Sequence, residues 1–131
     1  LLPKLIKMLE DEDTGVRYWA AVGCLVLGEK TYPAILKLRS RLDDPAPIVR
    51  AVAAEILGKF DSPEESLRVL NEMLYHSDEK IRLQAINAID YLDEKALPIL
   101  ESIKDKMNDD ANYVVRVTKK ILADFMKLSK E

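Results

Sequence analysis

The chain has 131 residues, 48% hydrophobic and 33% charged, which is enough for one domain with a buried core and a solvated surface. Four glycines are too few for a turn-rich all-β fold, and no apolar run approaches the roughly 18 residues typical of a membrane-spanning helix. The formal net charge of −3 disfavours nucleic-acid binding, which draws its affinity from Lys and Arg contacts to phosphates.

Apolar residues recur at helical spacing along the chain and predict successive pairs of helices, which we call A and B. The A helices are expected at residues 2–9, 33–42, 63–74 and 97–107. The B helices are expected at residues 16–27, 48–60, 81–92 and 114–128. These pairs divide the chain into units at about 1–28, 31–60, 62–92 and 95–131, which together form a single domain.

Prolines and one capping pattern indicate where the A helices begin. A proline in the first turn of a helix sacrifices no hydrogen bond, because the first amides are unpaired anyway. Each predicted A helix has a proline near its start, at Pro3, Pro33, Pro63 and Pro98. Ser62 and Glu65 have the spacing of a capping box, in which each side chain bonds to the backbone amide of the other. We therefore expect the third A helix to begin at Pro63.

An arginine recurs near the start of every predicted B helix, at Arg17, Arg50, Arg82 and Arg116. The intervals are 33, 32 and 34 residues, and such periods indicate stacked helical repeats whose units cannot bury their apolar faces alone. A small residue lies three places after each of the first three arginines, at Ala20, Ala53 and Ala85, and lets neighbouring B helices approach closely. The fourth unit has Lys119 there, so we expect a solvated face that ends the array.

The stretch DTGVRYWAAVGCLVLG at residues 13–28 resembles the second half of a HEAT repeat, whose signature is Asp-x-x-Val-Arg followed by an alanine-rich helix. The sequences DEKIR at 78–82 and NYVVR at 112–116 repeat this signature. The sequence PAPIVR at 45–50 is a variant with its acid further back, at Asp44. The resemblance covers essentially the whole chain and implies an all-α fold, an α-α superhelix or solenoid of about four helix pairs.

The same resemblance implies a role for the repeated arginines. HEAT arrays arrange them in a ladder, in which each arginine bonds to an Asp or Asn of a neighbouring unit. The structural ladder would then consist of Arg17, Arg50, Arg82 and Arg116 with Asp13, Asp44, Asp78 and Asn112. A row of arginines could instead bind phosphate or sulfate, but each has an acid or amide nearby, which favours pairing inside the array.

A second resemblance concerns the phrases VRYWAAVG, IRLQAINAIDYLDEKALPIL and NYVVRV. They are similar to the helical C-terminal extension of bacterial secreted sulfatases, whose separate upstream domain carries a calcium ion and a formylglycine made from Cys or Ser. Cys24 does not lie in the motif Cys-x-(Ser/Pro)-x-Arg that becomes formylglycine. The resemblance implies an accessory domain of an enzyme that acts on sulfated glycans in the periplasm or outside the cell; without it, we expect a cytoplasmic protein.

No combination of residues in the sequence predicts catalysis, a cofactor or a metal site. His76, Ser77 and Asp78 are consecutive in a turn, so their side chains diverge instead of converging as in a catalytic triad. Cys24, the sole cysteine, excludes an internal disulfide and a multi-cysteine zinc site, and is expected to behave as a small buried hydrophobe. The acid pairs in the turns are explained by helix capping.

The two ends of the array differ in composition. At the positions of Tyr18 and Trp19 the later units have no aromatic residue. The pair could fill core space against the first A helix, or anchor a contact with another domain, since Trp and Tyr dominate interface hot spots. Leu1, Leu2 and Ile6 would be partly exposed at the same end, which favours the second interpretation. Because the chain begins inside an apolar pattern without methionine, we expect a C-terminal fragment of a longer protein.

The leading functional hypothesis is a non-catalytic interaction or scaffold domain that packs against an upstream domain of its own chain or against another protein. The first alternative is the sulfatase accessory domain. The second is a nucleic-acid-binding protein like the alkylpurine DNA glycosylases built on HEAT-type repeats, which the acidic net charge and the lack of a basic groove disfavour. The expected partner is therefore a protein, with no cofactor, no nucleic acid and no membrane span.

Overall fold

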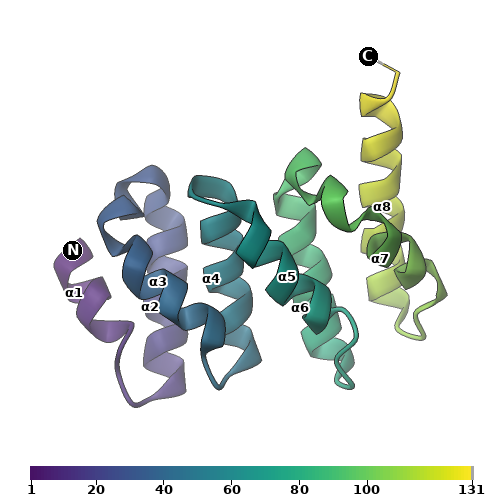
Figure 1. The fold of residues 1–131 in the computed structure, drawn as a ribbon. Coiled ribbons are helices and arrows are strands. Elements are labelled where there is room, and N and C mark those ends of the chain that lie inside the picture. The colour runs from purple at the N-terminus through teal and green to yellow at the C-terminus, as the bar shows by residue number, and fades with distance from the viewer. Residues whose placement is uncertain (131) are drawn as a thin grey trace.

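Helices follow one another along almost the whole chain, because apolar side chains recur at helical spacing and few glycines interrupt them (Figure 1). The computed structural model describes residues 1–130, and no β-strand occurs among them. Glu131, the last residue of the predicted fourth unit, lies outside the described residues. The predicted all-α class is confirmed.

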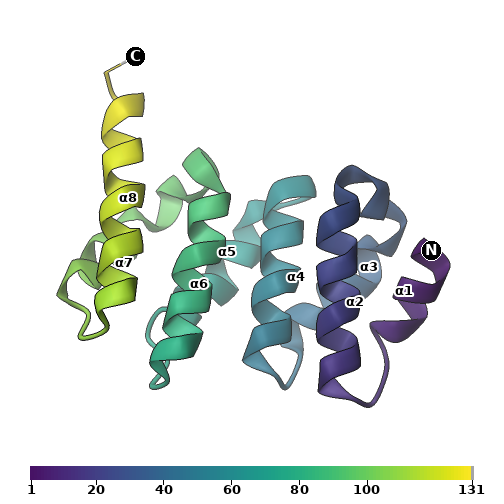
Figure 2. The same cartoon turned by 180° about the vertical axis from the view of Figure 1, so that it is seen from behind.

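The helices form two layers (Figures 1 and 2). The A layer contains the helices α1 (Leu2–Met8), α3 (Ile35–Ser40), α5 (Pro63–Met73) and α7 (Leu100–Asp105). The B layer contains α2 (Thr14–Leu27), α4 (Pro47–Phe60), α6 (Glu79–Tyr91) and α8 (Asn112–Leu128), which stand side by side. The main contacts join helices of the same or adjacent pairs, so the molecule is an elongated stack.

The connections into α3 and α7 differ from the prediction. Residues Gly28–Ala34 and Asp93–Ile99 form 3₁₀ helices (η1 and η3), with Pro33 and Pro98 inside them rather than at the start of an α-helix. The residue before a proline is disfavoured in the α region, so α-helical winding begins only after each proline. Two further 3₁₀ turns, η2 (Arg41–Asp43) and η4 (Lys106–Asn108), follow α3 and α7. The predicted helices at 33–42 and 97–107 were therefore too long.

The start of α5 was predicted correctly, but the capping box does not form. Pro63 occupies the first turn, and the Ser62 side chain makes no capping hydrogen bond. The Glu65 carboxylate lies 3.8 Å from Nε of Arg39 in the preceding A helix. Glu65 makes this contact instead of the capping bond with the Ser62 amide.

The core runs continuously between the two layers. The small residues Ala20, Ala53 and Ala85 are completely buried, as expected for positions where B helices approach closely. Helix α4 lies in the middle of the stack, and every residue from 51 to 58 is buried. Gly58 allows a close approach there, because a Cβ at this position would lie 2.7 Å from the Leu92 side chain. Lys119 is exposed, in agreement with the predicted solvated face.

Two residues with a positive φ follow the ends of B helices. Gly28 has a φ of 62° and begins the 3₁₀ connection after α2. Asp93 has a φ of 54° and begins the corresponding connection after α6. Glycine adopts this conformation without steric cost, whereas an aspartate is strained in it.

Candidate functional site

Arg17 of α2 forms a buried ion pair that joins the first helix pair to the second. Its Nε and Nη2 donate to the two carboxylate oxygens of Asp44 at 2.8 and 3.1 Å. Its Nη1 donates to the carbonyl oxygens of Asp11 and Glu12, both at 3.0 Å. Arg17 is 7% exposed and Asp44 only 1%. We call this arrangement the first rung.

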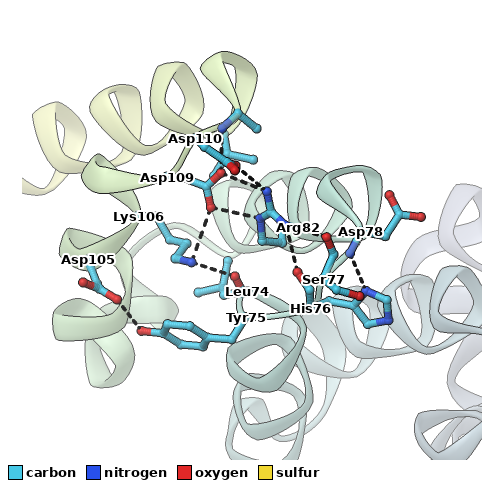
Figure 3. A network of polar contacts seen from close by, with 12 residues as sticks. Leu74, Tyr75, His76, Ser77, Asp78, Arg82, Asp105, Lys106, Asp109 and Asp110 are labelled. Carbon is cyan, nitrogen blue, oxygen red and sulfur yellow. Dashed lines mark hydrogen bonds and ion pairs between the residues drawn. The ribbon is translucent and has the colours of Figure 1, made fainter.

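Arg82 of α6 repeats the arrangement between the third and fourth helix pairs (Figure 3). Its Nε and Nη2 donate to the carboxylate of Asp109 at 3.0 and 3.3 Å. Its Nη1 donates to the carbonyl oxygens of His76 and Ser77 at 2.8 and 3.0 Å. In both rungs the carboxylate lies 27 residues after the arginine, in the turn that precedes the next B helix. We call this one the third rung.

Each rung carboxylate also meets a second basic residue, three positions before it. Arg41 Nη1 lies 3.1 Å from Oδ2 of Asp44, and Lys106 Nζ lies 3.4 Å from Oδ2 of Asp109. Lys106 is almost completely buried; its Nζ donates to the carbonyl oxygen of Leu74 and lies 4.2 Å from the centre of the Tyr75 ring (Figure 3). These basic residues were not singled out from the sequence, although the repeated spacing of a basic residue and an aspartate was visible there.

Arg50, between these two arginines, lacks the carboxylate. Its Nη1 donates to the carbonyl oxygens of Asp44 and Pro45 at 2.7 and 3.3 Å, as in the other rungs. Within residues 1–130 no ion pair joins Arg50 to an acid. Arg116 of α8 is exposed and lies 5.2 Å from the centre of the Tyr113 ring.

His76 occupies the place that an aspartate holds in the other turns. The carboxylates of Asp11, Asp44 and Asp109 each accept a hydrogen bond from the amide two residues later, at 2.8, 2.9 and 2.9 Å. Nδ1 of His76 accepts the corresponding bond from the Asp78 amide at 3.0 Å. Because Nδ1 is the acceptor, the other ring nitrogen, Nε2, carries the proton and cannot accept a hydrogen bond from the Arg50 guanidinium. The second rung therefore has a histidine where a carboxylate would stand.

The other predicted ladder residues have local roles. Asp13 and Asp78 are the N-cap residues of α2 and α6, and their carboxylates accept from the amides of Val16 and Lys80 at 3.0 and 2.9 Å. Asn112 is the first residue of α8 and makes no cap through its side chain. Arg82 thus bonds to Asp109 and not to Asp78.

The rung carboxylates are ionised at neutral pH. Burial acts to raise the pKa of Asp44, but the hydrogen bonds from Arg17 and the Ala46 amide outweigh it, and the pKa lies below its usual value. For Asp109, burial likewise acts to raise the pKa, while bonds from the Ala111 amide and Arg82 lower it further than burial raises it. Both carboxylates thus carry the charge that their arginines require.

The first helix pair exposes apolar side chains. Leu1 is 81% exposed, and Trp19 and Val26 on α2 are 65% and 81% exposed. Trp19 therefore does not fill core space; its ring contacts Tyr18 edge-on, with centroids 5.2 Å apart. The predicted interface residues Leu2, Ile6 and Tyr18 are partly buried against the core. We call Leu1, Leu2, Ile6, Tyr18, Trp19 and Val26 the first-unit surface.

The last helix pair ends differently. Lys120 on α8 donates to Asp90 at 2.9 Å and to Asp124 at 3.1 Å, and these bonds raise the pKa of Lys120 to about 12. Lys119 beside it is exposed. Tyr113 and Met126 are also exposed on α8, and the Arg116 guanidinium lies 5.2 Å from the centre of the Tyr113 ring.

Among the candidate chemical residues, the side chains of His76 and Asp78 accept from backbone amides of their own turn. Cys24 is completely buried, and burial raises the pKa of its thiol, which keeps it protonated. Within residues 1–130, no three His, Cys, Asp or Glu side chains are grouped so that they could hold a metal ion. Across the same residues no helix is both long and apolar enough to cross a membrane.

Comparisons with known proteins agree with this geometry. A family model described as HEAT repeats matches residues 35–118. The crystal structure of an engineered protein is similar with a TM-score of 0.72 at 16% sequence identity, over 94% of this chain. The chain spans 61% of the length of that protein, and the likeness shows the fold alone. No curated protein sequence matches the chain.

Proposed function

Because the chain belongs to the HEAT-repeat family, we propose that it is a non-catalytic protein-interaction domain whose partner covers the first-unit surface. The observation that carries this proposal is the 65% exposure of Trp19, the sole tryptophan. Trp and Tyr are the residues most enriched among those that contribute most to protein interfaces. An indole left in water on a rigid helix is typical of such an anchor.

The physical support comes from the neighbours of Trp19 on α2. Val26 lies two helical turns further along the same helix and is 81% exposed. Leu1, next to α1, adds a third exposed apolar side chain. Helix α8 also exposes apolar side chains, but it carries the ion-paired Lys120 and the exposed Lys119 as well. A partner with an apolar surface therefore gains more by docking on the first helix pair than on α8.

The fluorescence of Trp19 tests the proposal, because no other tryptophan contributes to the signal. In the isolated domain we expect emission typical of a water-exposed indole and efficient quenching by acrylamide. In the longer chain or complex that contains the partner, we expect a blue shift and protection from quenching. Unchanged quenching in that assembly would overturn the proposal.

The variant Trp19→Ala separates an interface role from a core role. We expect the isolated domain to keep its thermal midpoint, because an exposed side chain contributes little to stability, while docking weakens by about tenfold or more. Tyr113→Ala on α8 is the matched control, since Tyr113 is 64% exposed at the other end. It is expected to change neither property. A large loss of stability in Trp19→Ala would instead assign Trp19 to the fold.

The sulfatase accessory domain remains an alternative within this proposal, since it too would dock on a neighbouring domain. The reading frame upstream of Leu1 tests it: a Cys-x-(Ser/Pro)-x-Arg motif there would favour it. Retention on a DNA column at physiological salt would favour the nucleic-acid alternative over a protein partner.

A further inference from the structure

We propose that the cleft between η2, α4 and α5 binds a carboxylate group of an acidic peptide at the free edge of Arg50. The cleft has a volume of about 400 Å³ and is lined by residues that include Arg50, Arg68 and His76. This site is separate from the first-unit surface and does not depend on it.

The first and third rungs show how Arg50 would hold the ligand. In all three rungs Nη1 of the arginine donates to the carbonyl oxygens six and five residues earlier, so the guanidinium has the same anchor. In the first and third rungs the edge formed by Nε and Nη2 then holds a carboxylate in two hydrogen bonds. No acid within the described residues forms a hydrogen bond or an ion pair with the corresponding edge of Arg50.

Neither of the two chain groups that complete the first and third rungs is present at the second. His76 stands in the turn position of Asp44 and Asp109. Met73 stands three residues before it, where the other rungs have Arg41 and Lys106. Met73 and His76 both line the cleft, together with Arg50.

Further charged and polar groups line the cleft beside Arg50. Arg68 of α5 forms no ion pair within residues 1–130, and Nδ1 of His76 accepts from a backbone amide, which leaves its proton on Nε2. Asp43 and Glu72 also line the cleft and balance the formal charge of the two arginines, so the recognition rests on the two-bond geometry of the Arg50 edge and not on net positive charge. That planar edge matches a carboxylate, and the two acids oppose a phosphate dianion more strongly than a singly charged carboxylate.

The experiment follows the Nε–Hε signal of Arg50 by NMR during titration with short peptides at constant ionic strength. The probes are a tripeptide Gly-Asp-Gly with both ends blocked, the same peptide with Asn, and Gly-Asn-Gly with a free C-terminal carboxylate. Inorganic phosphate is the fourth probe. We expect saturable shifts of Arg50 with at least one carboxylate-bearing peptide, at least about tenfold tighter than with the blocked Asn peptide. The side-chain and C-terminal probes tell the two sources of carboxylate apart.

His76→Asp tests the site from inside the chain, because it restores an aspartate to the turn position opposite Arg50. We expect it to abolish the peptide-induced shift, while His76→Asn, which keeps the amide acceptor without the charge, retains it. Arg50→Gln should also abolish binding, as followed by the signals of neighbouring amides, and it replaces His76→Asp if that variant does not fold.

Three results would overturn the proposal. One is the absence of a saturable shift with every carboxylate probe, and another is tighter binding of phosphate than of the peptides. The third is undiminished peptide binding in His76→Asp or Arg50→Gln. The Nε–Hε signals of Arg17 and Arg82, whose edges are occupied, are the internal controls, and shifts there equal to that of Arg50 would show non-specific binding and overturn the proposal as well.

Discussion

The repeated arginine is anchored to its turn in the same way in the first and second rungs, but its guanidinium has different surroundings in the two. Arg17 is sealed against Asp44 with almost no exposure, whereas Arg50 keeps its carbonyl bonds and faces a cleft beside His76. Helix α4 packs against its neighbours on both sides, with every residue from 51 to 58 buried. The stack therefore holds together without a carboxylate at every rung, and apolar packing carries the second junction.

The difference shows two separable functions of the repeated arginine. Its Nη1 bonds fix the turn before its own helix, and this function is common to Arg17, Arg50 and Arg82. Its Nε and Nη2 bonds tie that helix to the next unit, and only the first and third rungs show this function.

The largest effect is expected for Asp44→Ala, which leaves Arg17 buried and unpaired. The free energy of unfolding should fall by about 3–5 kcal/mol, measured by urea denaturation. The exposed neighbour provides the control, since Asp43→Ala should change stability by no more than about 0.5 kcal/mol. Equally small losses of stability in Asp44→Ala and Asp43→Ala would mean that the ion pair of the first rung contributes little to the free energy of unfolding.

The next largest effect is expected at acidic pH, which should weaken the ion pair of the first rung. The pKa of Asp44 is lowered in the folded state, so its stabilising contribution is present above the pKa of the unfolded chain and is lost as pH falls through the folded value. We expect urea midpoints to fall with decreasing pH below about 4. Asp44→Asn should flatten this dependence relative to Asp43→Asn. An identical pH dependence in the two variants would contradict the assignment.

His76→Asp should convert the second rung into a copy of the first. The new carboxylate would accept from Nε and Nη2 of Arg50, and stability at neutral pH should rise by about 1 kcal/mol. His76→Asn keeps the turn bond without the charge and should stay close to the parent protein. A loss of stability in the aspartate variant alone would show that the two turns do not correspond.

The smallest effect concerns the connections after α2 and α6. Asp93→Gly removes the strain of a positive φ and should stabilise the fold by about 0.5 kcal/mol, measured as a rise in thermal midpoint. Gly28→Ala at the corresponding position should destabilise it by about 1 kcal/mol. Changes of the same sign in both variants would contradict the correspondence.

The sequence was sufficient for the helix pairs and their order, because helical periodicity and a regular arginine are local signals. The expected ladder included Asp44 but not Asp109, because in three of the four units the ladder residue was expected to be the acid or amide four residues before the arginine. The true partner lies in the turn of the next unit, which only stacking brings near. The spacing Arg41 to Asp44, repeated as Lys106 to Asp109, was the available signal.

Other features had no sequence signal. Tyr18 and Trp19 are adjacent on one helix, and a rotation of about 100° decides which of them packs partly against the core and which is exposed. Periodicity does not fix that angle when both neighbours are apolar. His76 was interpreted only as a turn residue whose side chain diverges from its neighbours, because its equivalence to three aspartates depends on a backbone hydrogen bond that sequence spacing does not display.

Each helix pair makes its main contacts with the adjacent pairs, and this determines how the stack unfolds. A helix pair at either end loses one partner, whereas α4 is enclosed by units on both sides. Denaturation is therefore expected to proceed as fraying from the two termini, with partly melted forms populated before the chain is fully unfolded. The amide protons of α4 would be the last to exchange with deuterium.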